Sequence, residues 1–232
     1  MLKKKEESIG LFTYYYDIRM LKILLLGAIS GFPWVIIGSS LSLWLKEEGL
    51  SRSTIGWAGL IFAVYALNYL WAPLIDKLRI PYLTKKFGHR RSWIILMQSV
   101  ILICLFLWSL MEPTKNLSLV IFVGLIIAIA SSTQDITVDA LRIEQIGENE
   151  NKSMAAGAAM AVVGWWTGYK VGGVISLFAA DIFQKIGINN YWQLTFLLLF
   201  LLVILMNIGL LFIEENDNFH RLEKQTKNQL AI

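Results

Sequence analysis

Long stretches without a charged residue limit what this sequence of 232 residues can fold into. Five uncharged runs cover residues 23–45, 53–75, 92–111, 116–134 and 186–213, and a sixth, 153–180, contains one lysine. A helix needs about 20 residues to cross a hydrocarbon core of ~30 Å, so each run is long enough to span a membrane. Hydrophobic residues make up 56% of the chain and charged residues 16%, which is unlike a soluble domain. The sequence therefore predicts an all-α integral membrane protein, a bundle of six transmembrane helices.

The ends of these runs give the expected organisation of the chain. Spans are predicted at about 21–45, 54–75, 92–111, 116–140, 153–180 and 191–213, which together form one transmembrane domain, 21–213. Residues 1–20 are expected to be a cytoplasmic N-terminal segment and residues 214–232 a polar cytoplasmic tail. The first run is too long for the core of a signal peptide, so we expect it to be retained as a span.

Positive charges are distributed unevenly along the chain. With the N-terminus inside, sixteen lysines and arginines fall in inner segments and four in outer loops, with Lys170 set aside. The positive-inside rule then predicts that both termini are cytoplasmic. The net charge of +4 is expected at the headgroups of membrane lipids, and no patch of interleaved aromatic and basic residues indicates a nucleic-acid partner.

Two aspartates stand at the end of the fourth uncharged run. Asp135, Asp139 and Arg142 are spaced four and three residues apart, so they share one helical face. A carboxylate in a low dielectric beside a basic partner can be tuned to bind and release a proton. Alternatively, Asp135 lies ~28 Å along its helix from Asn116, near the cytoplasmic interface, where a charge costs less. The spacing leaves a proton site and a simple interfacial charge both open.

Small residues and proline mark two of the predicted helices. Gly31 and Pro33 lie inside the first span, where a proline removes a backbone hydrogen bond and favours a kink. Such a kink is either tolerated or a bending point beside a substrate path. Gly164, Gly168 and Gly172 are four residues apart in the fifth span, so they predict a seam where a second helix approaches closely.

Lys170 is the one charge inside the fifth run, and Trp166 lies one turn before it. A lysine deep in a membrane avoids lipid, so a water-filled cavity floored by Lys170 and walled by Trp166 is one interpretation. The other is a lysine near the outer end of the helix whose ammonium group reaches the interface.

The sequence contains no pattern typical of a catalytic or metal-binding site. Cys104 is the sole cysteine, and no Cys/His spacing typical of a metal site occurs. No Ser/His/Asp arrangement or phosphate-binding glycine pattern occurs either. We therefore predict no catalytic residues, no metal and no cofactor, and a function other than that of an enzyme.

Four segments follow one another along the sequence: "SGFPWVIIGSSLSLWLKEEGLSRSTIG", "NYLWAPLIDKLRIPYL", "FGHRRSWIILMQ" and "SSTQDITVDALRIE". With their order they resemble the N-terminal half of the AmpG muropeptide permease family, from about residue 21 to residue 211. That family belongs to the major facilitator superfamily and is also similar to the acetyl-CoA transporters. The resemblance implies a multi-pass permease of the bacterial inner membrane that imports sugar–peptide fragments of the cell wall with protons.

The resemblance also implies roles for individual residues, all of them in the quoted segments or the fifth span. The acidic motif of the family matches Gln134, Asp135, Asp139, Arg142 and Glu144, with Gln134 able to bond sugar or peptide groups. The signature loop between the second and third spans matches Asp76, Arg90 and Arg91. The substrate cavity is expected to include Asn68, Trp166, Lys170, Tyr65 and Trp71.

Two departures from the family pattern bear on the substrate and the assembly. The family often has lysine where Asn68 stands and arginine where Trp166 stands, and Lys170 can restore one of these charges. An acyl-CoA-like anion is therefore an alternative substrate. The family has twelve helices, so six imply a second six-helix half, supplied by another copy or a separate chain. The alternatives are a remnant that does not transport and a membrane protein that binds a partner.

Overall fold

The computed structural model describes residues 11–146, 150–213 and 215, and every element within them is helical. Most of the predicted tail 214–232 and half of the segment 1–20 lie outside the described residues. The first predicted span follows a 3-10 turn, η1 (Leu11–Tyr16), and the second is divided by 3-10 segments. The elements are α1 (Ile18–Val35), the π-helical η2 (Ile36–Ser40), α2 (Leu41–Glu47), α3 (Arg52–Ala58), η3 (Gly59–Phe62), α4 (Ala63–Leu67), η4 (Asn68–Leu70), α5 (Ala72–Lys77), α6 (Leu83–Phe87), α7 (His89–Trp108), α8 (Pro113–Gln145), α9 (Asn151–Lys185) and α10 (Tyr191–Leu211).

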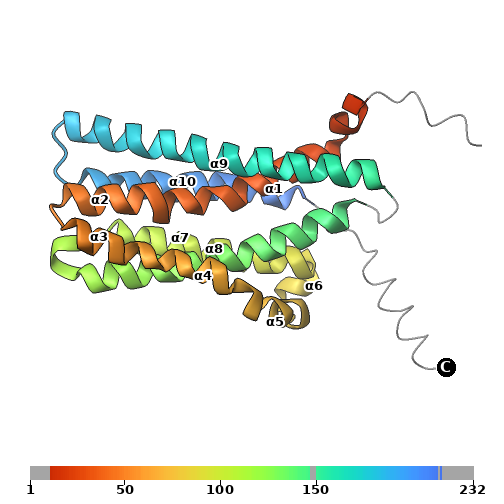
Figure 1. The fold of residues 1–232 in the computed structure, drawn as a ribbon, viewed down its shortest axis with the longest axis horizontal. Coiled ribbons are helices and arrows are strands. Elements are labelled where there is room, and N and C mark those ends of the chain that lie inside the picture. Colours follow the sequence, from red (N-terminus) through yellow and green to blue (C-terminus); the bar gives the residue numbers. More distant parts are fainter. Residues whose placement is uncertain (1–10, 147–149, 214, 216–232) are drawn as a thin grey trace, which may run out of the picture.

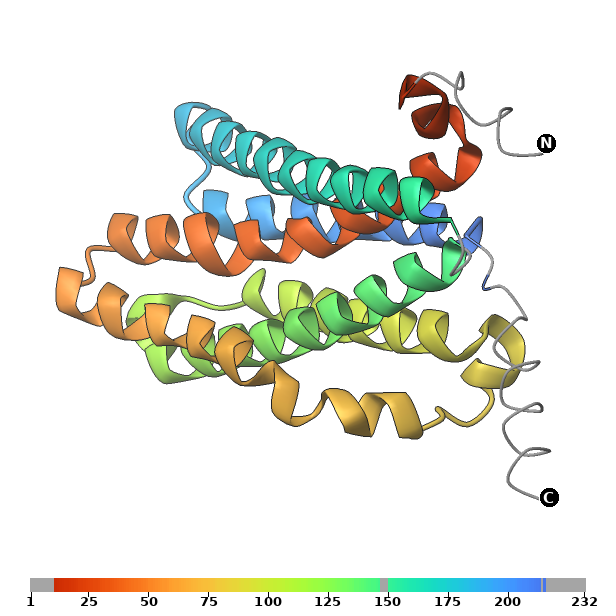
Figure 2. The same ribbon diagram turned by 45° about the vertical axis from the view of Figure 1, so that its right-hand side comes forward.

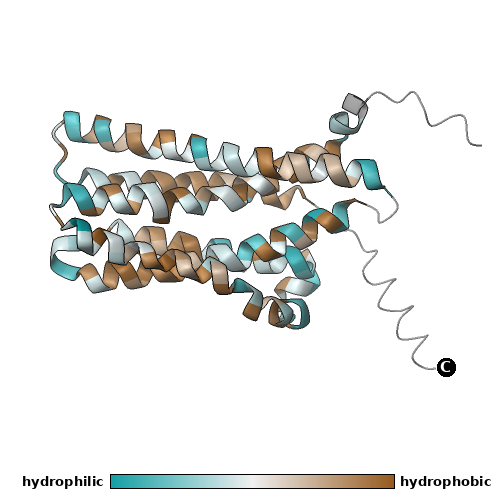
Figure 3. Cartoon of the chain, in the orientation of Figure 1, coloured by the Kyte–Doolittle hydropathy of each residue, from teal (hydrophilic) through white to brown (hydrophobic). Residues whose placement is uncertain are grey.

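The long helices lie side by side and form one bundle (Figures 1 and 2). α9 packs along α1 and α10, while α7 packs on α8 and α10. η1, α5 and α6 lie at one end of the bundle, and the α2–α3 and α9–α10 connections lie at the other (Figure 1). Hydrophobic residues predominate along the middle of α7 and α8, and hydrophilic residues gather around α5 and α6 (Figure 3).

The described residues confirm the prediction of an all-α membrane bundle. Five helical segments are long and apolar enough to cross a membrane: Ile18–Glu47, Arg52–Leu70, His89–Trp108, Pro113–Gln145 and Tyr191–Leu211. α9 has 35 residues, but its glycines, its alanines and Lys170 make it less apolar than the others. That α9 also crosses the membrane stays a prediction, as does the orientation of the termini.

Proline positions explain where the first two spans change their helical pattern. Pro33 lies inside the last turn of α1, and the π-helical η2 begins at Ile36, directly after α1 ends at Val35. Proline has no backbone N–H, so the carbonyl group of Ile29, four residues earlier, receives no bond from it. In the second span Pro73 stands in the first turn of α5, just after the irregular η4. Both breaks therefore follow from the sequence.

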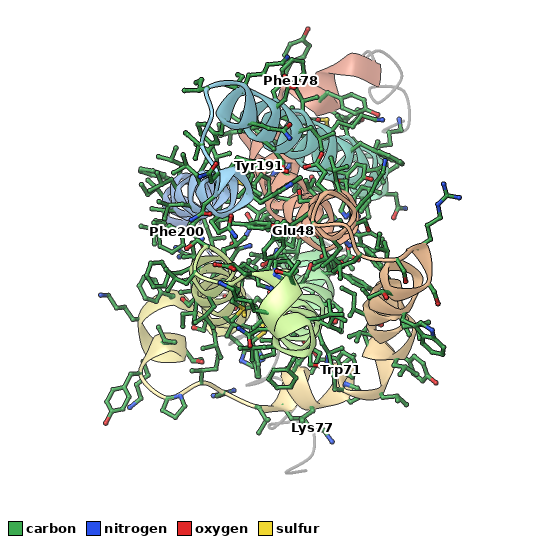
Figure 4. All side chains as sticks on the ribbon, turned by 90° about the vertical axis from the view of Figure 1, so that its left-hand side faces the viewer. Glu48, Trp71, Lys77, Phe178, Tyr191 and Phe200 are labelled. Atoms are coloured by element: carbon green, nitrogen blue, oxygen red, sulfur yellow. The ribbon has the colours of Figure 1, made fainter. Side chains whose placement is uncertain are left out.

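An aromatic core closes the end of the bundle that Figure 4 views along its axis. The rings of Trp44, Trp108 and Phe196 lie 4.8–5.9 Å apart and are fully buried. Trp192 joins them from the start of α10, and its indole N–H donates to Glu47 at the end of α2 over 2.7 Å. Aromatic groups dominate core energetics through the large area they bury, so this core fixes the ends of α2, α7 and α10.

The three glycines of the fifth predicted span lie against α1. A Cβ atom at Gly164 or Gly168 would collide with the α1 backbone, so no larger residue fits there without displacing a helix, and a Cβ atom at Gly172 would displace the Phe32 ring. Gly173, one position further along α9, faces open space. The seam is therefore restricted to one face of α9. Its contacts are Gly164 on the Leu24 carbonyl group, Gly168 on the Ala28 carbonyl group, and Gly172 on the Phe32 ring.

Candidate functional site

A pocket of about 390 Å³ opens between α1, α8 and α9. The close α1–α9 seam forms its back, and α8 supplies its charged residues. It brings together three residues that the spacing placed on one helical face, Asp135, Asp139 and Arg142. The remaining lining residues are Gly27 and Ser30 from α1, Val138 from α8, and Ala158, Ala161, Val162 and Trp165 from α9.

Asp135 lies in the pocket with a hydroxyl group as its hydrogen-bond partner. The Ser30 hydroxyl donates to the Asp135 carboxylate across the α1–α8 contact. Within the described part of the chain, no lysine, arginine or histidine pairs with Asp135 within 4.0 Å. A carboxyl group without a basic partner in an apolar pocket keeps access to both of its protonation states, because no adjacent cation fixes the ionised one.

Asp139 and Arg142 occupy the pocket differently from Asp135. The Arg142 guanidinium contacts the Asp139 carboxylate at 3.2 Å, as residues three apart on a helix can. The Asp139 side chain is 68% exposed, whereas that of Arg142 is 17% exposed. Asp139 is therefore a solvated, paired charge at the edge of the pocket, and Asp135 is the inner carboxylate.

Aromatic rings form one wall of the site and continue beyond it. Trp165, which lines the pocket, stacks on Tyr169 with ring centroids 5.6 Å apart. Its ring also lies edge-on to Trp34, with centroids 5.5 Å apart. The Trp34 ring centroid in turn lies 4.5 Å from that of Tyr65 and 5.0 Å from that of Phe62. α1, α4 and α9 thus share a continuous aromatic surface, of a kind that ligand sites use for apolar and ring-shaped groups.

Three buried polar side chains lie near this wall: the Trp34 indole and the hydroxyl groups of Tyr65 and Ser131, from α1, α4 and α8. Within the described residues, none of their polar atoms makes a hydrogen bond of good geometry. The Trp34 indole nevertheless interacts with the Asp135 carboxylate, and Tyr65 interacts with Ser131. Buried polar groups in native proteins are bonded in the great majority of cases, so these contacts account for the burial of all three.

Lys170 and Trp166 were expected to form the cavity, but neither residue lines the pocket. Lys170 does lie over the Trp166 ring, 5.3 Å from its centroid, but both residues are on the exposed face of α9. Trp165 takes the position expected for Trp166. The reason is helical geometry, since Trp165 is adjacent to the Gly164 seam while Trp166 is turned a further ~100° away.

Gln134, Asn68 and Trp71 also lie outside the pocket lining. Gln134 is fully buried, and both ends of its amide group are bonded inside the protein, to Gln98 and to the Ile29 carbonyl oxygen. Asn68 begins η4, and Trp71 follows it beside α8, where the indole N–H donates to Thr133 over 3.0 Å. Figure 4 shows Trp71 on the outer side of α8, away from α9.

The residues of the predicted signature loop form a second charged cluster at one end of the bundle. Arg90 donates to Asp76 in α5 and, over 3.1 Å, to Glu144 near the end of α8. Glu144 therefore belongs to this cluster, although the motif places it close to Asp135 in sequence. Arg91 donates to the Leu211 carbonyl oxygen over 3.1 Å, which ties α7 to the end of α10.

Glu215 completes this cluster by capping α7. Its carboxylate accepts the backbone N–H groups of His89, Arg90 and Arg91 over 3.0–3.2 Å. A negative charge at a helix N-terminus is favourable because it meets the unpaired N–H groups and the positive end of the dipole. Gly88 has a φ of 91°, and a side chain there would collide with Glu215. The glycine before "HRR" thus makes room for the cap.

Sequence reasoning missed Ser30, Trp34, Trp165 and Gln98. Ser30 and Trp34 flank Gly31 and Pro33 within the quoted "SGFPW", and Trp165 is half of the "WW" pair, so the relevant signal was present. Gln98 is an uncharged polar residue in an apolar span, and such residues are costly in a membrane unless bonded. Among the described residues no group of three or more metal-ligating side chains comes together.

Comparisons with known proteins agree on the family. A family model described as the Major Facilitator Superfamily matches residues 23–231. "Putative transporter AmpG 4" of Rickettsia felis is 36% identical over 203 residues, which cover 88% of this chain and 47% of the relative. "Putative transporter AmpG 1" of Rickettsia conorii is 33% identical over 87% of this chain and 47% of the relative. "Anhydromuropeptide permease" of Escherichia coli K12 is 32% identical over 76% of this chain and 34% of the relative. The chain spans about half the length of the curated Rickettsia relatives it matches.

Proposed function

The chain belongs to the major facilitator superfamily, and we propose that it works as half of a proton-coupled permease that imports cell-wall sugar–peptide fragments across the bacterial inner membrane. The pocket between α1, α8 and α9, with Asp135 inside it, is the observation that carries this proposal. As an integral, multi-pass membrane protein of a transporter family, it has a lipid environment and a small-molecule substrate.

The substrate proposal is supported by the name of a relative and by the chemical groups that line the pocket. A relative that shares 32% of residues over 178 positions is named "Anhydromuropeptide permease". The pocket joins an aromatic ring to carboxylates and a guanidinium group, a combination suited to a sugar ring with hydroxyl and carboxylate substituents. An acyl-CoA-like anion remains the alternative substrate, because Arg142 is the one cation in the pocket lining and would bind a phosphate as well.

The proton-coupling proposal is supported by the bond between Ser30 and Asp135. An ionised Asp135 accepts the Ser30 hydroxyl, as in the structure. A protonated Asp135 can itself donate, and the serine hydroxyl can rotate to accept, so both states are satisfied in one geometry. We propose that the protonated state allows the carrier to reorient with substrate bound and that release of the proton on the cytoplasmic side completes import.

A second six-helix half is part of the proposal. Carriers of this family type bind substrate between two halves, and alternating access requires one half to rock against the other. The relatives are about twice the length that this chain matches, which supports a second six-helix half in the working carrier. Crosslinking in native membranes tests this point: species containing two six-helix units are expected, and monomer alone would contradict a paired permease.

Uptake of labelled anhydromuropeptide tests the function. The full chain is expressed in cells that lack their own permease, and its membrane abundance is measured in the same samples. Uptake that an uncoupler abolishes is the expected result, because import then depends on the proton gradient. Undiminished uptake after uncoupling would contradict proton coupling. No uptake by abundant protein, even with a candidate second half co-expressed, would favour a remnant that does not transport.

A further inference from the structure

Three side-chain amides form a continuous chain through the middle of the bundle, from α10 to α1. Asn207 on α10 donates to the Gln98 carbonyl oxygen over 3.2 Å. Gln98 on α7 donates to the Gln134 carbonyl oxygen over 2.5 Å, and Gln134 on α8 donates to the Ile29 backbone oxygen over 3.0 Å. From this chain we propose that Gln98 and Asn207 are positioning residues for Asp135, an inference that rests on the proposed function of Asp135.

The direction of each amide is fixed by backbone carbonyl groups at both ends of the chain. The Ile29 oxygen can only accept, so the amino end of Gln134 must face it and the carbonyl end must face Gln98. At the far end the Asn207 amino group donates both to the Val203 backbone oxygen, over 2.8 Å, and to Gln98. Every amide therefore has one orientation that satisfies its partners, and the loss of one member releases its neighbours.

The proline in α1 explains why Gln134 is needed at this place. Pro33 cannot donate to the Ile29 oxygen, which would otherwise stay unpaired in the bundle interior. An unsatisfied backbone group within a membrane has no water to bond, so helices with a proline recruit a neighbouring donor. The Gln134 amide is that donor, and it attaches α1 to α8 at the position where α1 lacks its own hydrogen bond.

The attachment lies directly beside the pair that we propose binds the proton. Ile29 and Gln134 are joined, and the next residues along each helix, Ser30 and Asp135, are joined as well. Gln98 is 3% exposed and Gln134 is fully buried, so the first bond is held rigidly inside the bundle. A change in Gln98 therefore reaches the Ser30 hydroxyl through one shared element, the broken turn of α1.

The charged and titratable groups that face Asp135 come from two elements. Asp139 and Arg142 line the pocket with it on α8, and Tyr65 of α4 lies within electrostatic reach. The pocket residues of α1 and α9 carry no charge. None of these groups contacts Gln98 or Asn207 in the described structure, so the amide chain acts through position rather than through charge.

Protonation of Asp135 itself is the readout that separates positioning from a general structural role. Purified full-length protein in lipid vesicles is treated with a carbodiimide, which modifies protonated carboxyl groups, over a range of pH. Modification of Asp135 is quantified by mass spectrometry, and the Asp135→Asn variant identifies the signal. The variant Gln98→Met keeps the size of the side chain and removes its bonds. Ser99→Ala is the matched control, because that exposed hydroxyl bonds within α7, to the Ile95 carbonyl oxygen.

The inference predicts that Gln98→Met moves the midpoint of Asp135 protonation to higher pH by roughly half a unit or more, since the ionised form loses a well-placed donor. Ser99→Ala leaves the midpoint unchanged. Where the Gln98→Met protein does not accumulate, Asn207→Leu makes the same test at the partly buried end of the row of amides. An unchanged midpoint in either abundant variant would overturn the positioning role while leaving the proposed function intact. A wild-type Asp135 with no protonation midpoint would overturn both.

Discussion

Asp135 and Glu144 are carboxylates on the same helix, nine positions apart, and they have opposite environments. Asp135 accepts a serine hydroxyl inside a pocket, with no basic residue paired to it within 4.0 Å in the described chain. Glu144 pairs with Arg90, which also holds Asp76, and Glu215 caps the helix that carries Arg90. In the proposed function Asp135 is the carboxylate that changes its charge, whereas Glu144 is held in a network of charges.

The contrast favours two different roles for the carboxylates of α8, one structural and one in proton exchange. A carboxylate paired with arginine contributes to structure because separation would leave a buried charge uncompensated. A carboxylate with a hydroxyl partner can gain or lose a proton without breaking its contact. The charged cluster therefore ties α5, α7, α8 and the end of α10 together, and we propose that the pocket binds the proton and the substrate.

The largest effect is expected from Asp135→Asn. Asparagine keeps the shape of the side chain and cannot exchange a proton, so uptake falls to the background of cells without the protein while membrane abundance is unchanged. Asp181→Asn is the control, because that carboxylate lies outside the pocket lining and pairs with Lys185 on the exposed surface of α9. Measured uptake that survives in Asp135→Asn would make Asp135 an interfacial charge like its neighbour Asp139.

Arg90→Ala is expected to destabilise the fold by about 3 kcal/mol, since it leaves the partly buried Glu144 without its partner. Asp76 contributes little to this figure because its side chain is 54% exposed. Unfolding in detergent measures the effect. Lys115→Ala, which breaks a pair whose lysine is 70% exposed, should change stability by less than about 0.5 kcal/mol. Equal losses in both variants would remove the distinction between a structural cluster and surface charge.

Gly168→Ala tests the close α1–α9 seam beyond the pocket. Its new methyl group would meet the Ala28 carbonyl group in α1, so a loss of about 2 kcal/mol in stability is expected. Gly173→Ala is the matched control, because nothing lies within 4 Å of that position. The replacement there should be neutral or slightly stabilising, as alanine is the better helix former. A Gly168→Ala variant as stable as Gly173→Ala would contradict the seam.

The smallest effect concerns Asp17, which caps α1 from outside the membrane-spanning segment. Its carboxylate accepts the Arg19 backbone N–H over 2.9 Å, and this bond, with the Arg19 guanidinium, lowers the pKa of Asp17. A lowered pKa means that the stabilisation is present above the unfolded value of about 3.9 and is lost as the pH falls through the folded value. Asp17→Ala should cost about 1 kcal/mol at neutral pH and less in acid. An effect of the same size at both pH values would contradict the cap.

The residues explain why the helices were predictable and the site was predictable in part. Uncharged runs fix helices because a membrane leaves the backbone no other way to satisfy its hydrogen bonds. The spacing of Asp135, Asp139 and Arg142 predicted that they share one helical face, and all three line the same pocket. The spacing did not predict that Gln134 faces α7 or that Glu144 pairs with Arg90, because these two contacts depend on which helix packs on each face of α8. Trp165 and Trp166 are neighbours in the sequence, and the packing of α9 on α1 turns only Trp165 toward the pocket.

Proton movement driven by substrate tests the central claim most directly. The native assembly is extracted and reconstituted in vesicles with a pH-sensitive dye inside, and anhydromuropeptide is added outside. Our account predicts that substrate entry acidifies the lumen with the wild-type chain, and that Asp135→Asn abolishes the signal while Asp181→Asn, outside the pocket lining, retains it. Acidification at the wild-type rate in Asp135→Asn would show that the proton follows another path, and it would contradict the account.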